Sequence, residues 1–188
     1  MSIWDEMKSC NACKLRGQCN QVVLPCGNRE NPILMAIGEC PNNAEDEQGF
    51  PFVGRSGECL RTAFRQTGLN RTNTIISYII KCKPPGNKFP KDDCPDICVS
   101  KWLSEEIKLL QPKILLLIGS SALKYVAELE GITNLRGQWI TVKGIRVLAT
   151  YHPSYVLRKE NEGYLSFKDV FMNDVVKVSE EVKKLAKS

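Results

Sequence analysis

The sequence has no long hydrophobic run. No apolar stretch in it reaches the roughly 18 residues that a membrane-spanning helix needs. The first ten residues, "MSIWDEMKSC", carry acidic side chains where a secretory signal would have a basic block and then an apolar block. We therefore expect a cytoplasmic protein that does not contact a membrane.

A disulfide framework is also not expected. The chain has nine cysteines, but the cytoplasm keeps thiols reduced and 188 residues exceed the size of a small secreted scaffold. Metal binding is the better interpretation. The net charge of +5 is modest. Basic runs such as "KCKPPGNKFPK" agree with attraction to a polyanion, although most such runs are solvated faces.

The composition shows no shortage of large apolar side chains. The hydrophobic fraction is 43% and the charged fraction is 25%, which are values of ordinary globular proteins rather than disordered ones. A chain of this length forms one domain with a substantial core. We expect a single domain over residues 1–188 that needs no obligate protein partner.

Four short apolar runs are typical of strands that are buried on both faces. They are "PILMAIG", "TIISYII", "KILLLIG" and "IRVLAT", at residues 32–38, 74–80, 113–119 and 145–150. Helical patterns lie between or after them, at 56–68, 96–112 and 169–187. Strands that alternate with helices predict parallel pairing. The expected fold is an α/β three-layer sandwich with a central four-stranded parallel sheet.

Ligands of such sheets bind beyond the carboxyl ends of the strands, so the segments that follow the four runs are informative. One of them holds His152, which is the only histidine of the chain. A lone histidine is often a structural residue without a chemical role. Its position directly after a predicted strand, between Tyr151 and Pro153, favours a functional role instead.

Three motifs follow the predicted strands. They are "GECPNNAEDEQGFPFVGRSG" at 38–57, "KCKPP" at 81–85 and "TYHPSYVLR" at 150–158. In order and spacing these motifs resemble those of the thermostable-type, family-four uracil-DNA glycosylases. The resemblance extends over nearly the whole chain. It implies the uracil-DNA glycosylase-like fold, DNA as the partner, and hydrolysis of an N-glycosidic bond.

The resemblance also assigns four cysteines to a 4Fe-4S cluster. These are Cys10, Cys13, Cys82 and Cys98. Four thiolates with a C-x-x-C pair can equally hold zinc, so the residues alone leave the metal open. Cys94 competes for the fourth position, but Cys98 has the better spacing and is expected to open a helix. The other cysteines, Cys19, Cys26, Cys40 and Cys59, are expected to be small buried or loop residues.

The resemblance further implies the chemistry of the site. Phe52 matches the residue that stacks on the extruded base. His152 matches the donor to the departing base, whose developing negative charge needs stabilisation. Glu39 is placed to orient the attacking water. Asn42 stands where the family commonly has glycine, and it either holds water or is a turn residue that, like Asn43, tolerates a left-handed backbone.

Further residues are assigned to the base and to the DNA. Glu45, in a motif with Asp46, matches a glutamate that lies near the 5-position of the pyrimidine. Arg55 and Ser56 lead into a helix near backbone phosphates. The segment "HPSYVLR" resembles a loop that enters DNA. In it Tyr155 and Val156 are wedge candidates and Arg158 is a phosphate contact, and we expect Lys81, Lys83 and Lys88 to lie near the DNA path.

One position departs from the family pattern. The family has an asparagine four residues before the cysteine of "KCKPP", and that amide reads the uracil edge, but here the position is Tyr78. A phenol offers a single hydroxyl where an amide offers a donor and an acceptor. With Cys40 and Asn42 in the first motif, the changes fall in the base pocket. Alternatively, Tyr78 packs within its strand and Ser77 reads the base.

The substrate therefore stays open between uracil and a modified pyrimidine, such as an oxidised base or a hypermodified phage cytosine. The motifs contain no obvious Schiff-base lysine, which favours a monofunctional glycosylase that leaves abasic sites without cutting the strand. Two other classes remain as alternatives, namely a non-catalytic DNA-binding module of the same fold and a structural zinc protein. Retention of Glu39, Phe52 and His152 argues against the binding module.

Overall fold

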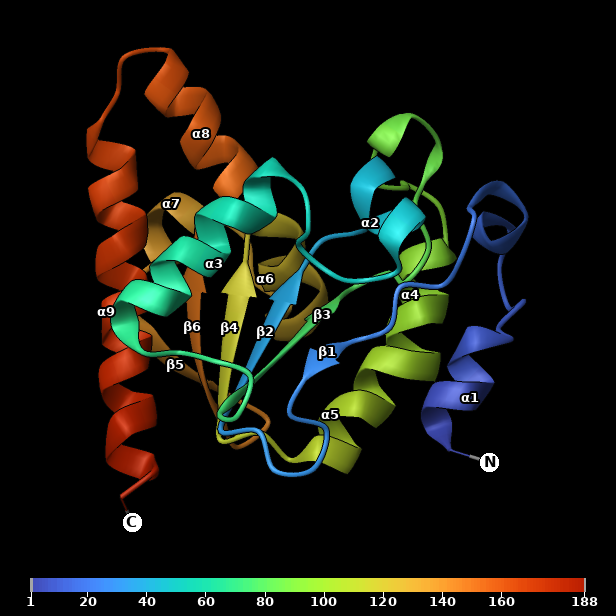
Figure 1. Cartoon of the computed structure of the whole chain (residues 1–188), viewed down its shortest axis with the longest axis horizontal. Coiled ribbons are helices and arrows are strands. Elements are labelled where there is room, and N and C mark those ends of the chain that lie inside the picture. Colours follow the sequence, from blue (N-terminus) through green and yellow to red (C-terminus); the bar gives the residue numbers. More distant parts are fainter. Residues whose placement is uncertain (1, 188) are drawn as a thin grey trace.

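The computed structural model describes residues 2–187, and the core of these is a mixed β-sheet between layers of helices (Figure 1). Within the described residues the sheet has the strand order β1-β3-β2-β4-β6-β5. The strands are β1 (Cys26–Gly27), β2 (Leu34–Gly38), β3 (Thr74–Tyr78), β4 (Ile114–Ile118), β5 (Trp139–Val142) and β6 (Ile145–Thr150).

The four predicted strands are confirmed as the parallel centre of this sheet. Strand β2 pairs in parallel with β3 and β4, and β4 pairs in parallel with β6. The two edge strands were not predicted, and both are antiparallel. Strand β5 joins β6 through a two-residue turn, Lys143–Gly144, in which both residues have positive φ, as tight hairpins require.

Alternate residues of each strand face opposite layers, which confirms the three-layer arrangement. In β4, Leu115 and Leu117 pack with Trp102 and Leu103. Ile114, Leu116 and Ile118 instead pack in the second core, together with Leu60, Phe64, Val175 and Val178. Figure 1 shows α3 and α9 covering one face of the sheet. Burial on both faces explains why the central strands are continuous apolar runs.

The helices connect and cover these strands. They are α1 (Ile3–Lys8), η1 (Lys14–Gln18), α2 (Asn43–Gln48), α3 (Arg55–Thr67), η2 (Pro85–Asn87), α4 (Cys94–Cys98), η3 (Val99–Leu103), α5 (Ser104–Leu110), α6 (Ser120–Ala127), α7 (Ile132–Leu135), α8 (Pro153–Asn161) and α9 (Ser166–Leu185). Within residues 2–187, none of them combines the length and the apolar character that crossing a membrane would take.

Two of the predicted helices end as the sequence indicates. Helix α3 stops at Gly68, whose φ is 84° and whose N–H caps the last turn. The pattern at 96–112 forms one path through α4, η3 and α5, and it ends at Gln111 in a left-handed conformation before Pro112. The middle part, η3, is a π-helical turn.

The segment "HPSYVLR" is not a loop, so that expectation is wrong. His152 caps the amino end of α8 with its ring, and Pro153 occupies the first helical position, where its missing N–H costs nothing. The following residues continue as helix to Asn161. This segment therefore presents a helix, rather than a flexible loop, at the edge of the sheet.

A buried ion pair lies under the end of β3. Lys81 is 2% exposed and its Nζ is 2.9 Å from Oε2 of Glu106, which is fully buried. The Lys81 ammonium also donates to Ser77 Oγ at 2.6 Å and to the Tyr78 carbonyl at 2.7 Å. Oε1 of Glu106 has no hydrogen-bond partner among the described residues. Lys81 is thus a structural residue and does not face DNA, contrary to the expectation.

We predict that Lys81→Met lowers the free energy of unfolding by about 3–5 kcal/mol, because it leaves the Glu106 carboxylate buried without a counter-charge. Denaturant unfolding monitored by circular dichroism measures the change. The double variant Lys81→Met/Glu106→Leu should recover most of the loss, because apolar side chains can replace a buried pair. A double variant as unstable as the single one would contradict this interpretation.

Candidate functional site

Phe52 has an unusual backbone conformation at the carboxyl end of the sheet. Its φ is +54°, a left-handed value that is rare for a bulky residue and costs free energy. Its N–H donates to the Tyr78 hydroxyl at 2.8 Å, and its carbonyl accepts from Arg61. A Cβ on Gly57 would lie 1.8 Å from the same carbonyl oxygen, so only glycine fits there.

Glu45 fixes the chain on both sides of this turn. Its carboxylate is 1% exposed. Oε1 accepts the N–H groups of Val53 and Gly54, both at 3.0 Å, and Oε2 accepts the N–H of Asn42, also at 3.0 Å. Three charge-assisted hydrogen bonds compensate the burial of this charge. Glu45 therefore joins the start of α2 to the turn that presents Phe52.

Tyr78 packs its ring against Phe52, with ring centroids 5.0 Å apart. Strand β2 ends beneath them in Gly38, where a Cβ would lie 2.6 Å from Phe52 Cζ and 2.9 Å from Tyr78 Cε1. Burial, with nearby Glu45 adding to it, raises the pKa of the Tyr78 hydroxyl well above 10. The hydroxyl thus stays protonated, and it already accepts one hydrogen bond from Phe52.

His152 follows β6, two strands away from β2 in the sheet, and its ring centroid lies 6.0 Å from that of Phe52. Its Nδ1 accepts the backbone N–H of Ser154 at 3.2 Å and lies 2.7 Å from the Ser154 hydroxyl. Because a backbone N–H can only donate, the proton of the neutral ring is on Nε2. Burial lowers the pKa of His152 from 6.5 to about 4, so this ring is a neutral donor.

The rings of Phe52 and Tyr78 are both buried in the conformation described. Phe52 is 1% exposed and Tyr78 is 2% exposed. A base that stacks on Phe52 therefore requires a neighbouring side chain to move.

Glu39 follows β2, and it is held by a residue that follows β4, the neighbouring strand. Its Oε2 accepts the hydroxyl of Ser121 in the first turn of α6. The thiol of Cys40 lies 4.0 Å from Oε1. Sequence reasoning did not single out Ser121, although "GSSALKY" follows the third predicted strand and places a hydroxyl at the same edge.

Asn42 is the residue before α2, and its role as a left-handed turn residue is contradicted. Its φ is −104° and its ψ is −169°, which is extended backbone. Asparagine is favoured at the residue that precedes a helix. Asn43 is the first residue of α2 and is not left-handed either.

Cys40 is 6% exposed beside this site. Burial, together with Glu39 and Glu45, raises the pKa of its thiol far above 9. The thiol therefore stays neutral and unreactive at physiological pH.

A groove of about 460 Å³ runs beside the site, and we call it the Arg158 groove. It brings together five sequence-predicted residues from three segments, namely Asn42, Glu45, Arg55, Ser56 and Arg158. Ser154 and Asn87 also line it. The cationic side chain of Arg55, at the start of α3, suits a groove that contacts phosphate.

The predicted wedge residues do not project from the surface. Val156 is fully buried, so it cannot enter DNA in this conformation. The Tyr155 ring packs against Tyr151 and Phe167, with centroids 5.1 and 5.5 Å away. Lys83 is half-buried and does not line the Arg158 groove. The aromatic and aliphatic residues exposed nearby are Tyr164 and Leu165, between α8 and α9.

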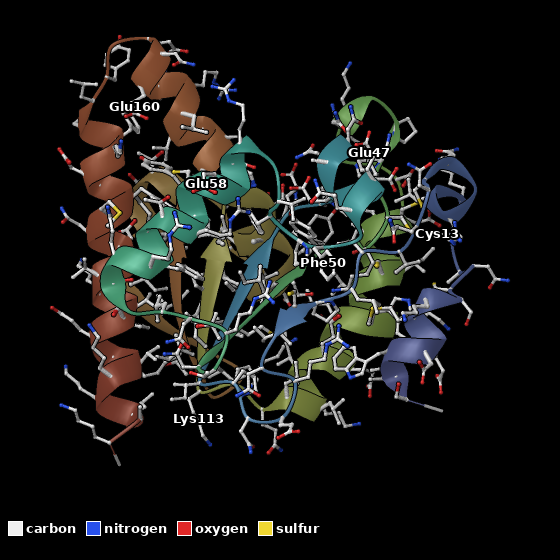
Figure 2. The ribbon with its side chains drawn as sticks, viewed as in Figure 1. Cys13, Glu47, Phe50, Glu58, Lys113 and Glu160 are labelled. Atoms are coloured by element: carbon white, nitrogen blue, oxygen red, sulfur yellow. The ribbon has the colours of Figure 1, made fainter. Side chains whose placement is uncertain are left out.

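The four cysteines assigned to metal line one cavity. Cys10, Cys13, Cys82 and Cys98 come from the segment after α1, from the end of β3 and from α4. Apolar residues, including Val22 and Ile80, form the remaining wall. Figure 2 shows Cys13 on the segment that passes α4. Trp102 Nε1 donates to Cys10 Sγ at 3.1 Å, the kind of contact that tunes a metal-bound sulfur.

The expectation that Cys98 opens a helix is wrong. The helix begins at Cys94, and Cys98 ends α4 one turn later, so Cys98 does not open a helix. Cys98 nevertheless lines the cavity. Cys94 is buried, and its N–H donates to Asp92.

Asp46 links the cysteine segment to the site. It is 2% exposed and accepts the N–H groups of Asn20 and Gln21 at 2.9 and 3.3 Å. Because Asp46 lies in α2 next to Glu45, the N-terminal segment is tied to the helix that fixes the Phe52 turn. Sequence reasoning gave Asp46 only a place in the motif.

The comparisons with known proteins agree with this arrangement. A family model described as the Uracil DNA glycosylase superfamily matches residues 24–176. The match includes Glu39, Phe52, Tyr78 and His152. The protein is therefore a member of the uracil-DNA glycosylase superfamily.

Individual relatives narrow the class. A type-4 uracil-DNA glycosylase of Thermotoga maritima is 32% identical over 183 residues, which cover 96% of this chain and 93% of the relative. A type-4 uracil-DNA glycosylase of Sulfurisphaera tokodaii is 34% identical over 169 residues, covering 85% and 76%. The chain belongs to the type-4 uracil-DNA glycosylase family, which confirms the resemblance seen in the motifs and the enzyme class, DNA glycosylase.

We predict that the His152 ring stays neutral down to about pH 4, with its proton on Nε2. The unfolded chain takes up a proton near pH 6.5, so this group's contribution to stability is complete above pH 6.5 and is lost as the pH falls toward 4. Because the chain has one histidine, ¹⁵N NMR of labelled protein reports this ring alone. Titration near 6.5, or a proton on Nδ1, would contradict the assignment.

Proposed function

We propose that the protein is a monofunctional DNA glycosylase, formed by one domain, that extrudes a pyrimidine nucleotide and hydrolyses its N-glycosidic bond. The observation that carries this proposal is the neutral His152 ring, fixed as an Nε2–H donor beside Phe52. Such a donor can stabilise the negative charge that develops on a departing base. The family membership and the adjoining Arg158 groove agree with a DNA substrate.

In this proposal the residues act at different points of the reaction. The Arg158 groove binds phosphates beside the extruded nucleotide through Arg55, Ser56 and Arg158. The base enters against Phe52, and His152 Nε2–H donates to its oxygen as the glycosidic bond breaks. Glu39, oriented by Ser121, positions the water that attacks the sugar, and Asn42 at the start of α2 assists in holding that water.

The identity of the base depends on Tyr78. Its hydroxyl has a proton to donate but accepts from Phe52, so it offers an incoming base a donor where an amide would offer both groups. We propose that the substrate is uracil or a modified pyrimidine, with a keto or substituted edge that meets this donor. If the base is a hypermodified phage cytosine, its removal would act against phage DNA.

We predict release of free base, and no strand cleavage, from DNA oligonucleotides that carry the substrate base. A panel with uracil, oxidised pyrimidines, hydroxymethylcytosine and glucosylated cytosine identifies it, scored by chromatography of the free base and by alkali-labile sites. His152→Asn should lower the rate about 10²–10³-fold. Asparagine keeps the cap of α8, so the stability should change little.

The control separates this proposal from a non-catalytic DNA-binding module. A binding module would retard labelled DNA and leave no alkali-labile sites with any base of the panel. Equal rates for the wild type and His152→Asn would overturn the role of the histidine. Full selectivity for uracil would show that Tyr78 does not redirect the pocket.

We infer that the cysteine cavity holds a 4Fe-4S cluster. The residues fit such a group because four cysteines line one cavity whose other walls are mostly apolar, and Trp102 donates to one of the sulfurs. When bound, the cluster supplies a cross-link between the N-terminal segment, the end of β3 and α4. Its ligands would be Cys10, Cys13, Cys82 and Cys98, and its role is structural.

We predict that protein purified without oxygen is brown and contains iron and inorganic sulfide in equal amounts. Cys98→Ser should lose the colour and most of the iron, because it removes a ligand. Cys94→Ser is the matched control, since Cys94 is also a buried cysteine and is only four residues away, and it should keep both. Colourless protein that contains zinc would contradict the assignment, as would iron loss from the Cys94 variant alone.

A further inference from the structure

A second groove opens at the same edge of the sheet, and we call it the Phe89 groove. Its volume is about 540 Å³. One wall is the segment after η2, with Phe89 and Lys91, and the other is α6, with Ser121, Lys124 and Tyr125. Apart from Ser121, the residues that line this groove have no role in the proposed chemistry of the base pocket.

The Phe89 groove shares one residue contact with the proposed active site. Ser121 lines the groove and donates to Glu39, so the groove wall contacts the carboxylate to which the proposed function assigns the attacking water. On the other side of the same segment, Asn87 lines the Arg158 groove. Residues 84–91 therefore lie between two grooves. In Figure 1 the segment after β3, in green, rises past α2 at the edge where the strands end.

The chemistry of the Phe89 groove suits a polymer with flat bases and a negatively charged backbone. The rings of Phe89 and Tyr125 are both partly exposed, with centroids 5.6 Å apart. Lys124 forms an ion pair with Glu130 at 2.9 Å. Asp92, the residue after Lys91, forms an ion pair with Lys14 at 2.7 Å instead of with Lys91. Aromatic rings beside a lysine are the elements with which proteins hold single-stranded nucleic acid, through base stacking and phosphate contacts.

We propose that the Phe89 groove binds the substrate strand on one side of the extruded nucleotide. A flanking base stacks on Phe89 and Tyr125, and its phosphate contacts Lys91. The Arg158 groove then holds the same strand on the other side, so the strand crosses residues 84–91 at the active site. This inference rests on the proposed function, because it takes the strand to be the one whose base is removed.

The test uses single-stranded oligonucleotides with one substrate base and with flanks extended on the 5′ side, on the 3′ side, or on both. Binding is measured by fluorescence anisotropy and base release by steady-state kinetics. Phe89→Leu keeps the apolar wall but removes the stacking ring, and it should weaken binding about 5- to 100-fold. The loss should appear only for oligonucleotides that carry one particular flank, with kcat unchanged.

Lys91→Gln tests the phosphate contact. A methylphosphonate, which removes the charge of one phosphate, should weaken wild-type binding at one position of that flank and leave the variant unaffected there. Lys143→Gln is the matched control, because Lys143 is exposed at the turn before β6. It should bind all oligonucleotides like the wild type.

The outcomes separate the two proposals. If Phe89→Leu loses binding equally for all flanks, or loses none, the groove assignment is overturned. Base release by the wild type would still support the glycosylase proposal in that case. Flank-specific loss of binding supports the groove even if no base of the panel is released, in which case only the glycosylase proposal fails. If Lys91→Gln binds duplex oligonucleotides more weakly but binds single strands like the wild type, the groove contacts the complementary strand. That result would overturn the proposal.

Discussion

The left-handed backbone of Phe52 is the constraint on which the rest of the site depends. A bulky side chain does not hold this conformation by itself, so the surrounding groups must supply the free energy. The Tyr78 hydroxyl, the Arg61 guanidinium and the Glu45 carboxylate bind the peptide groups on either side of it. These residues come from β3, α3 and α2, so one turn fixes three elements relative to one another.

The carboxylates of Glu39 and Glu45 are each compensated locally. Glu45 is satisfied by three backbone N–H groups and Glu39 by Ser121, so neither requires a positive histidine as a partner. His152 can therefore remain neutral and keep a proton on Nε2. In the proposed reaction, the hydrogen bond of this neutral donor strengthens only as charge develops on the substrate.

The sequence predicted the parts of the fold that follow from periodicity. The four central strands were visible as continuous apolar runs because both of their faces are buried. Strand β1 was missed because two residues carry no periodicity. Strand β5 was missed because its tight turn, Lys143–Gly144, lacks the asparagine or aspartate that usually marks such hairpins. The segment after His152 was taken for a loop, although Pro153 at a first helical position is a helix signal.

For the site, the motifs placed Phe52, Tyr78 and His152 together, as the structure does, but they did not indicate how each one is held. That Lys81 is buried could not be read from a basic run, because its partner Glu106 is 25 residues away in a helix that otherwise looks amphipathic. Ser121 was missed for the same reason, since its only link to Glu39 is spatial. Contacts between distant segments depend on packing, and a local pattern does not contain them.

The contact between Lys81 and the Tyr78 carbonyl has a consequence for how this pocket can change over time. The backbone at position 78 is fixed from behind by a buried ammonium group that does not touch the phenol ring. Substitutions of the side chain at that position can therefore accumulate without moving the end of β3 or the neighbouring Cys82. A lineage with this arrangement can therefore change the side chain at position 78 while the cysteine cavity stays under separate selection.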